Sequence, residues 1–431
     1  MKKILKIFVL SASFFAFFAP LFSEEFDSDI LAKPHRYFEI GVDSNIAAAN
    51  NLYGIKDVFK KELVIDLEQI SNDLKDSGFN AGFLNQEQVF LNLNLGSRIR
   101  FSAFAGIEAS SHMNISDDLF ELLGSGLRVG ETKTVDVTGY ADVFANVGVS
   151  FQTIVNNYGI KITPTYFVPI VYVPKSTATG RLETSSSGAI KASAESNVDI
   201  YTAVNMHDFM EDEKTLDNLS LDAAKILSNG GFDLTLELDH NWFHRFNAGL
   251  YTRIPILAGT LNYKMSTRFW ASYYTEGLLD DVLNDELPSP EHGIGWEDEE
   301  TGEKETIRYS EETYKAYRPF KLGVKASYSP FGDWLKIQPS LGIAVRNPYS
   351  SDERIFYPEY SLDFRISLVK RIFNFNFGTA YQSQIFQQRA GFSLNLRVLE
   401  ILAQASMCGT SLMSSFDRNG YGAMVGVRIG F

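Results

Sequence analysis

The last eleven residues of the chain alternate strictly between two kinds of side chain. One set is apolar, and it consists of Tyr421, Ala423, Val425, Val427, Ile429 and Phe431. The other set is small or polar, and it consists of Gly422, Met424, Gly426, Arg428 and Gly430. Because successive side chains of a β-strand point to opposite faces, this pattern predicts a strand with one apolar face and one small or polar face.

The same alternation recurs through most of the chain. It is clear in residues 89–96, 99–107, 143–151, 232–239, 246–254, 320–328, 335–345, 360–368, 373–381, 390–396 and 399–407. Tight connections near Phe331, Lys370 and Leu399 alternate with long ones at 347–358 and 409–420. A soluble β-sandwich also alternates, but this many apolar faces would need a second sheet to cover them. We therefore expect an all-β, antiparallel barrel of about 14 strands.

Two segments leave the strand number open. Residues 158–204 contain Pro164, Pro169 and Pro174, and proline has no N–H to donate to a ladder. They predict either kinked strands at an opening or a protruding hairpin. Residues 257–274 are strand-like but ambiguous. If these segments cross the barrel wall, the count rises to about 16.

Residues 55–75 change to a helical spacing. Val58, Phe59, Leu63, Leu67, Ile70 and Leu74 recur on one side, and Gly78 follows as a stop. We expect an amphipathic helix that either plugs the barrel or covers one end of it. With Tyr37 to Val42 as a short strand, this gives an N-terminal segment at 24–86 and a barrel domain at 87–431.

The N-terminus is typical of a secretory signal. Lys2, Lys3 and Lys6 precede an apolar run, and Leu21-Phe-Ser23 comes before the acidic pair Glu24 and Glu25. We expect a signal peptide at 1–23, with cleavage after Ser23. Cys408 is the only cysteine, so an intrachain disulfide cannot form.

Hydropathy and charge exclude other classes. No apolar run of 18 residues occurs after the N-terminus, which excludes a helical membrane protein. The net charge is −14, and residues 275–317 contribute fourteen acids against three bases, or −11. This stretch predicts an acidic, solvated loop. No basic cluster suggests nucleic acid as a partner.

The predicted inner face carries many basic residues. The candidates for residues that face the lumen and a ligand are Arg98, Arg100, Lys321, Lys325, Lys336, Arg346, Arg365, Arg389, Arg397 and Arg428. Acidic residues on the same face include Asp233, Glu237, Asp239, Asp363 and Glu400. A basic wall opposite a smaller acidic one would favour anionic solutes. The structural alternative pairs these cations with helix acids at Glu62, Asp66, Glu68 and Asp73.

No catalytic or cofactor site is predicted. The six histidines are scattered, and His240 and His244 flank a turn rather than sharing a helix face, so a metal pair is not expected. Gly-rich phosphate loops are absent. We therefore expect a protein that is not an enzyme and that binds no cofactor or metal.

The alternating strands and the closing strand that ends in Phe431 resemble those of Gram-negative outer-membrane β-barrels. This resemblance implies the cell outer membrane as the location. It also implies membrane lipid and the barrel-assembly machinery as partners, the latter through the strand that ends in Phe431. In layout, the chain is similar to FadL-type long-chain fatty-acid transporters. That similarity implies an N-terminal plug, at Tyr37 to Gly78, and a lateral exit at a strand kink near Pro164 to Pro174.

Three function classes follow. The first is a transporter or channel for small anionic or hydrophobic solutes, including fatty acids. The second is a general diffusion porin, which requires an open lumen. The third is a surface-exposed binding or structural barrel that uses its long loops. The sequence alone does not separate the three classes.

Overall fold

The computed structural model covers the chain from the N-terminal segment to Phe431. It describes residues 30–31, 36–52, 67–75, 77–186, 190–206, 219–243, 245–274, 291–294, 296–297, 304–305, 307–351, 353–369, 372–417 and 419–431. The predicted signal peptide at 1–23 lies outside these residues.

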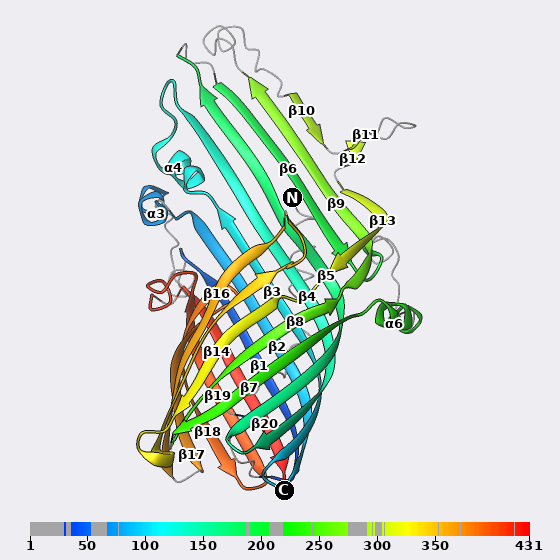
Figure 1. The fold of residues 1–431 in the computed structure, drawn as a ribbon. Helices are drawn as coiled ribbons and strands as arrows, with labels where there is room; N and C mark the ends of the chain where they lie inside the picture. Colours follow the sequence, from blue (N-terminus) through cyan, green and yellow to red (C-terminus); the bar gives the residue numbers. More distant parts are fainter. Residues whose placement is uncertain are drawn as a thin grey trace.

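Most strands of the described chain pair into one closed antiparallel ring (Figure 1). The main sheet has eighteen strands; β6, β9, β10 and β13 lie outside the ring, which leaves fourteen. The ring runs through β1 (Phe38–Asn50), β2 (Phe79–Leu95), β3 (Ile99–Ile115), β4 (Thr132–Val155), β5 (Tyr158–Thr184), β7 (Gly231–Phe243), β8 (Phe246–Leu257), β14 (Phe320–Tyr328), β15 (Leu335–Arg346), β16 (Ile355–Val369), β17 (Phe373–Gln382), β18 (Ile385–Leu396), β19 (Leu399–Gly409) and β20 (Gly420–Gly430).

The C-terminal strand closes the ring, as the alternation predicted. β20 pairs with β19 on one side and with β1 on the other, where Ile429 lies opposite Ile40. The ring of Phe431 stacks on Phe38 at 5.6 Å between centroids, and the Phe431 carbonyl accepts hydrogen bonds from the amides of Tyr37 and Phe38. The first and last described strands therefore hold each other in register.

A second region, which we call the extension, continues the sheet beyond the ring. It contains the first part of β4, the second half of β5, and β6 (Ile190–Thr202), β9 (Gly259–Tyr274), β10 (Glu291–Ile294) and β13 (Ile307–Ala316). Figure 1 shows these strands protruding beyond the end of the barrel opposite the C-terminus. A short separate hairpin joins β11 (Trp296–Glu297) to β12 (Lys304–Glu305).

β5 connects the two regions because it changes partner along its length. Tyr158–Phe167 pairs with β7 in the ring, whereas residues 171–184 pair with β6 in the extension. The registers of β5 shift beside Pro169 and Pro174, where proline cannot donate to the ladder. The predicted irregularity is therefore confirmed. At this point β5 changes its partner from β7 to β6 along one edge, while it stays paired with β4 along its other edge.

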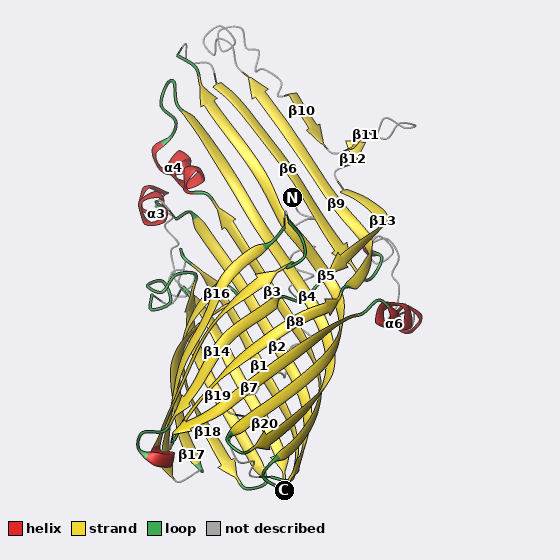
Figure 2. Ribbon diagram, in the orientation of Figure 1, coloured by secondary structure: helices red, strands yellow, loops and turns green. Residues whose placement is uncertain are grey.

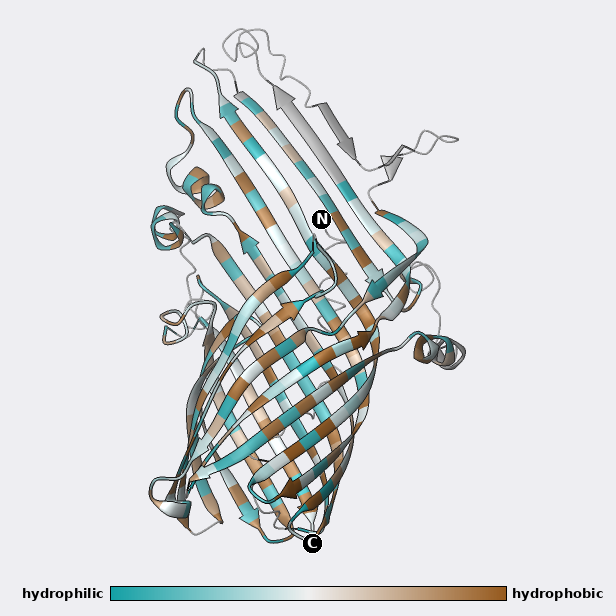
Figure 3. Ribbon diagram, viewed as in Figure 1, coloured by the Kyte–Doolittle hydropathy of each residue, from teal (hydrophilic) through white to brown (hydrophobic). Residues whose placement is uncertain are grey.

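The two faces of the ring differ sharply in polarity. Apolar side chains on the outer face are strongly exposed, among them Val149 at 56%, Leu341 at 60% and Ile429 at 52%. The inner face carries buried polar residues such as Asp43, Asn376 and Gln404. Figure 3 shows the resulting change of hydropathy from residue to residue along the strands.

The helices are short and lie at the end of the barrel that has the long connections (Figure 2). They are α3 (Leu67–Leu74), α4 (Asp117–Ser125) and α6 (Leu219–Ser228), and a 3-10 turn, η2 (Gly332–Trp334), joins β14 to β15 at the other end. α3 contacts α4, and Phe79 beside α3 meets Phe120 of α4 at 6.5 Å. The described helices therefore do not fill the barrel.

The predicted plug at Tyr37 to Gly78 is wrong for its described part. Residues Phe38–Asn50 form the wall strand β1, and β2 begins at Phe79. The barrel therefore begins at Phe38 and not at residue 87. Residues 53–66 lie outside the described part of the chain. The apolar-polar alternation of 38–50 was hidden by Ala47, Ala48 and Ala49, which carry little hydrophobic signal.

Two further segments differ from the prediction. The stretch between residues 107 and 143, which the alternation did not assign to a strand, is largely strand, because β3 continues to Ile115 and β4 begins at Thr132. In the acidic stretch 275–317, residues Ile307–Ala316 form β13 and pair with β9. Many residues of that stretch lie outside the described ranges. The ambiguous segments β6 and β9 are strands, but they pair in the extension, so the ring keeps fourteen strands.

Candidate functional site

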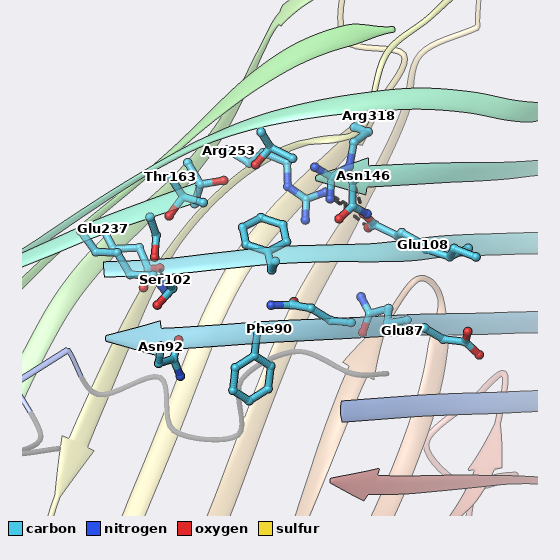
Figure 4. A pocket seen from close by; sticks show the side chains of 18 residues that line it. Glu87, Phe90, Asn92, Ser102, Glu108, Asn146, Thr163, Glu237, Arg253 and Arg318 are labelled. Atoms are coloured by element: carbon cyan, nitrogen blue, oxygen red, sulfur yellow. Dashed lines mark hydrogen bonds and ion pairs between the residues drawn. The ribbon is translucent and has the colours of Figure 1, made fainter. Parts of the chain in front are cut away.

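The candidate site is a cavity inside the ring (Figure 4). It has a volume of about 170 Å³ and is lined by inward-facing residues of β2, β3, β4, β5, β7 and β8. Uncharged polar side chains dominate its wall, among them Gln86, Asn92, Ser102, Asn146 and Thr163. Such a wall can donate and accept hydrogen bonds, so it suits a water-filled or polar-solute-filled space.

Two phenylalanines interrupt this polar lining. Phe90 and Phe104 both border the cavity. Each ring packs against a glycine of the neighbouring strand, because a Cβ on Gly41 would come within 2.4 Å of Phe90 and a Cβ on Gly148 within 2.4 Å of Phe104. The two glycines therefore allow an aromatic ring to lie close to the wall and leave the lumen open beside it.

A charged network closes one side of the cavity. Glu108 on β3 forms ion pairs with Arg253 of β8, at 3.2 Å, and with Arg318 of the β13–β14 connection, at 2.6 Å. Arg318 also reaches Asp233 on β7 at 2.7 Å. Figure 4 shows the three side chains Glu108, Arg253 and Arg318 converging. Because β4, β5 and β7 lie between β3 and β8 in the ring, these ion pairs link separate parts of the wall.

A second link is formed by Arg346 at the end of β15. Its side chain is almost completely buried and pairs with Asp142 on β4 at 2.8 Å. The guanidinium lies between the rings of Tyr140 and Tyr172, at 4.6 and 4.1 Å from their centroids. Between β4 and β15 the ring contains β5, β7, β8 and β14. Arg346 therefore bridges the lumen near the end with long connections, and we call this group the Arg346 bridge.

Other inward cations are paired within the wall. Lys325 contacts Glu237, which also receives Lys161 at 3.2 Å. Lys321 pairs with Glu359 at 3.0 Å. Buried charges without a partner are very unfavourable, so these pairs keep the lumen stable while leaving it with little excess charge.

A short part of the N-terminal segment enters the opposite end of the lumen. The Ile30 amide donates to Asp239 at 3.2 Å, and its carbonyl accepts from Gln152 at 2.6 Å. Arg36 donates to the Arg397 carbonyl at 3.0 Å and pairs with Glu400 at 3.2 Å. These contacts join residues that precede Tyr37 to the inner wall. The sequence analysis had instead placed the plug at Tyr37 to Gly78.

The structure brings most of the ten predicted residues to the inner face. Arg389 pairs with Asp363 and Arg428 with Asp43, each at 3.0 Å. Arg100 donates to Asn94 at 2.7 Å. Lys336 lies opposite Arg365 in the β15–β16 register, again on inward positions. With Lys321, Lys325 and Arg346 described above, eight of the ten follow the inward alternation. Arg98 and Arg397 are exposed residues of tight turns and do not line the lumen.

The inward cations pair with carboxylates of the barrel wall. The structural alternative had paired them with acids of the predicted helix, of which Glu62 and Asp66 lie outside the described residues. Sequence reasoning missed Glu108, Asp142 and Glu359. Their inward alternation was a usable signal, but the predicted strands at 99–107, 143–151 and 360–368 were one residue too short to include them.

The extension has its own charge cluster. Lys264 on β9 lies 3.2 Å from Asp199 of β6 and 3.1 Å from Glu312 of β13. Burial alone would lower the pKa of Lys264, but the hydrogen bonds to Glu312 and Asp199 raise that pKa above its usual value. The cluster therefore favours the charged lysine and ties three strands together.

The described residues form neither a metal-ligand cluster nor a membrane-crossing helix. In the part of the chain that the structure describes, no group of three or more His, Cys, Asp or Glu side chains could hold a metal ion. His240 lies beside Tyr158 instead, at 4.3 Å between ring centroids, and His244 is outside the described residues. Among the described helices, none is long and apolar enough to cross a membrane.

Comparison with known proteins finds only distant structural likenesses. No family model and no curated protein matches the chain. Among solved structures, the Ralstonia pickettii toluene transporter TbuX is 7% identical with a TM-score of 0.42, covering 92% of this chain and 90% of that one. The P. putida toluene transporter TodX is 8% identical with a TM-score of 0.40, covering 93% of each chain.

A Pseudomonas aeruginosa FadL homologue is also similar. It is 11% identical with a TM-score of 0.39, covering 92% of this chain and 90% of that chain. The assignment of the chain as a closed fourteen-stranded barrel rests on its own strand pairings.

Proposed function

We propose that the protein is an outer-membrane β-barrel that carries small polar solutes through its lumen and is held closed by ion pairs across that lumen. One observation supports this more than any other: exposed apolar side chains surround a closed ring whose interior is polar. A soluble protein rarely leaves so large an apolar surface uncovered, whereas a barrel in a bilayer must.

The lining of the cavity favours a polar solute over a hydrophobic one. Amides and hydroxyls make up half of its lining residues and charged side chains a third, whereas Phe90 and Phe104 are the main apolar contributions. A path for fatty acids would be lined predominantly by apolar groups, because water bound to amides and hydroxyls would have to be displaced. The paired inner charges likewise reduce the preference for anions that an unpaired basic wall would have.

The contacts across the lumen favour a gated transporter over a general diffusion porin. The Arg346 bridge and the Glu108–Arg253 pair connect wall strands that are not neighbours. A solute that crosses the barrel has to pass these links, so at least one must open. Each link joins hydrogen-bonded charges, which can separate and be replaced by water without leaving an apolar surface exposed.

The test is ion conductance in planar bilayers for the wild type and for the double variant Arg346→Ala/Asp142→Ala. We expect low or brief conductance for the wild type and more frequent openings for the double variant, because both halves of the bridge are gone. Arg98→Ala is the matched control, since this arginine lies in an exposed turn. It should conduct like the wild type.

Other outcomes would change the proposal. A large, steady conductance of the wild type would contradict closure and favour a diffusion porin. The absence of conductance in every variant, with the barrels correctly inserted, would contradict transport.

The protruding extension supports a second candidate, a surface-exposed binding barrel. Strands β6, β9 and β13 lie outside the ring and have no role in closing it. This candidate gains if both the wild type and the bridge variant insert into membranes but conduct no ions, because the lumen would then be a packed support for the extension.

A further inference from the structure

One row of paired residues runs from the Arg346 bridge into the extension. In the strand registers, Asp142 on β4 lies opposite Tyr172 on β5, and Tyr172 lies opposite Tyr201 on β6. Tyr201 in turn lies opposite Lys264 on β9. Directly opposed residues of neighbouring strands place their side chains on the same face of the sheet. The acid of the bridge and the lysine of the extension therefore stand in one row on one face.

A tyrosine of a further strand completes a column of rings on this row. Tyr314 of β13 stacks on Tyr172 at 5.1 Å and on Tyr201 at 4.2 Å between ring centroids. A cation lies at each end, because the Arg346 guanidinium is 4.1 Å from the centroid of Tyr172 and the Lys264 ammonium is 5.5 Å from that of Tyr201. Aromatic faces attract cations at such distances. We call these five side chains the tyrosine column.

The column is tightly packed. Tyr172 is 0% exposed and Tyr201 is 6% exposed, and both belong to the buried cluster against which Tyr314 packs. Protein interiors are close-packed, so one ring cannot shift unless its neighbours shift with it. A movement of β6 or β13 therefore has to be passed on to Tyr172, and from there to the guanidinium of Arg346.

On the bridge side, hydrogen bonds reinforce this connection. The Tyr314 hydroxyl contacts the carboxylate of Glu353, which also accepts from the Asn347 amide at 2.8 Å. Asn347 directly follows Arg346 in the chain. Tyr314 thus reaches Arg346 twice, through the ring of Tyr172 and through the backbone of the next residue.

On the extension side, β13 is held by the charge cluster of Lys264. The Tyr201 hydroxyl donates to Glu312 at 3.3 Å, and Lys264 pairs with the same carboxylate at 3.1 Å. Glu312 and Tyr314 both belong to β13. The cluster therefore fixes the strand that carries the middle ring of the column.

The extension also contains a lysine cluster that has no place in the column. Lys133 on β4 pairs with Asp118 of α4 at 3.1 Å and contacts Glu121 of the same helix. None of these three residues belongs to the column or to its buried cluster. Two lysine–carboxylate clusters of the extension thus differ in one respect, which is their connection to the bridge.

We propose that the extension controls the Arg346 bridge through the tyrosine column. When β6 and β13 are displaced, Tyr314 leaves the face of Tyr172, Tyr172 is free to turn away from Arg346, and the pair with Asp142 separates more readily. The inference rests on the proposed gated transport and names how that gate is regulated. The extension is then a part of the gate.

The experiment measures single-channel conductance in planar bilayers. The variants are Tyr314→Leu, Lys264→Met and the matched control Lys133→Met, each in the wild type and in the Arg346→Ala/Asp142→Ala background. Leucine removes the aromatic ring, and methionine removes the charge of lysine while it keeps most of the chain length. Folding of each variant is checked by its heat-modifiable gel mobility.

We expect Tyr314→Leu to raise the ratio of open to closed time roughly fivefold, which corresponds to about 1 kcal/mol, the value of one aromatic pair. Lys264→Met should raise the ratio roughly twofold, because its contact with the ring is longer. Neither variant should have a further effect once the bridge is removed, because residues that act through one another are not additive. Lys133→Met should leave the ratio unchanged in both backgrounds.

Three outcomes would contradict these expectations in different ways. An unchanged ratio in both column variants would overturn the inference and leave the gate intact. Equal effects with and without the bridge would also overturn it, because the extension would then act on the lumen by another route. A bridge variant that opens no more often than the wild type would overturn the proposed gate itself, and the inference with it.

Tyr314→Phe separates the ring from the hydroxyl. It keeps the stack and removes the hydrogen bond to Glu353, so its ratio of open to closed time should stay close to that of the wild type. Openings as frequent as those of Tyr314→Leu would overturn the column, because the hydroxyl and not the stacked ring would then carry the control.

A second measurement reads the coupling in the opposite direction. Coupling between two sites is reciprocal, so loss of the bridge should loosen the extension. Arg346→Ala/Asp142→Ala should speed amide hydrogen exchange in β6 and β13 roughly fivefold and leave β18 and β19 unchanged. Unchanged exchange in β6 and β13 would contradict the coupling even if the conductance of the variant rises.

Discussion

The ring and the extension are built from continuous strands but treat their outer faces differently. In the ring, one row of paired outward residues runs Phe101, Phe151, Ile162 and Leu236. In the extension, the corresponding rows run Val135, Gly180 and Ala194, and Val137, Ala178 and Ser196. β4 and β5 contribute to both regions. The outward side chains therefore become smaller along single strands, from the ring to the extension.

This difference shows where the chain is adapted to lipid. Large apolar residues on an outer face are favourable in a bilayer and unfavourable in water, whereas glycine, alanine and serine are tolerated in water. The other face of the extension is polar, with Asp136 accepting a hydrogen bond from Thr179 at 2.8 Å. The extension thus has the surface of a soluble sheet joined to a membrane barrel.

The largest expected effect comes from breaking the joint between the two regions. Phe144, Phe167, Tyr172, Tyr201, Leu261 and Ala316 form a buried cluster that includes strands of both. Phe144→Ala should cost about 3–5 kcal/mol of folding free energy, because it leaves a cavity in this cluster. Hydrogen exchange should show faster exchange in β6 and β9 than in β18 and β19. Equal acceleration in all four strands would mean that the two regions unfold as one unit.

Charges placed on the outer face should distinguish the regions next. Phe151→Arg puts a cation on the ring's apolar face and should destabilise the membrane-inserted barrel by about 2–4 kcal/mol. Val135→Arg, on the extension, is the matched control and should change stability by no more than about 0.5 kcal/mol. Urea titration of folding into liposomes measures both. Similar losses at the two sites would remove the proposed boundary between lipid and water.

The smallest effect concerns the Lys264 cluster of the extension. Lys264→Met should lower the stability of β6, β9 and β13 by up to about 1 kcal/mol, because the pair with Glu312 is partly exposed. The pKa of Lys264 is raised in the folded state, so its contribution is present below the unfolded pKa of about 10.4 and is lost as pH rises above that value. Limited proteolysis at pH 8 and pH 11 tests this. A wild type and variant that differ more at pH 11 than at pH 8 would contradict the sign.

Four parts of the ring show where the prediction from sequence succeeded and where it failed. The alternation in 320–345 and 421–431 predicted strands with the correct inward residues, because each side chain's face follows from its parity. β1 was predicted only as a short strand at Tyr37 to Val42, because Ala47, Ala48 and Ala49 are too small to reveal the pattern in its second half. The partners of Arg346 were missed because Asp142 is more than two hundred residues away in the chain.

The sequence by itself determined most of the ring's strands, the apolar outer face and the closing role of the last strand. These properties are local, since they depend on alternation within about ten residues. The tertiary structure alone decided three others: β5 exchanges β7 for β6, β6 and β9 leave the ring, and the inner cations pair with acids of distant strands. Register and closure depend on which strands meet, and no local pattern contains that information.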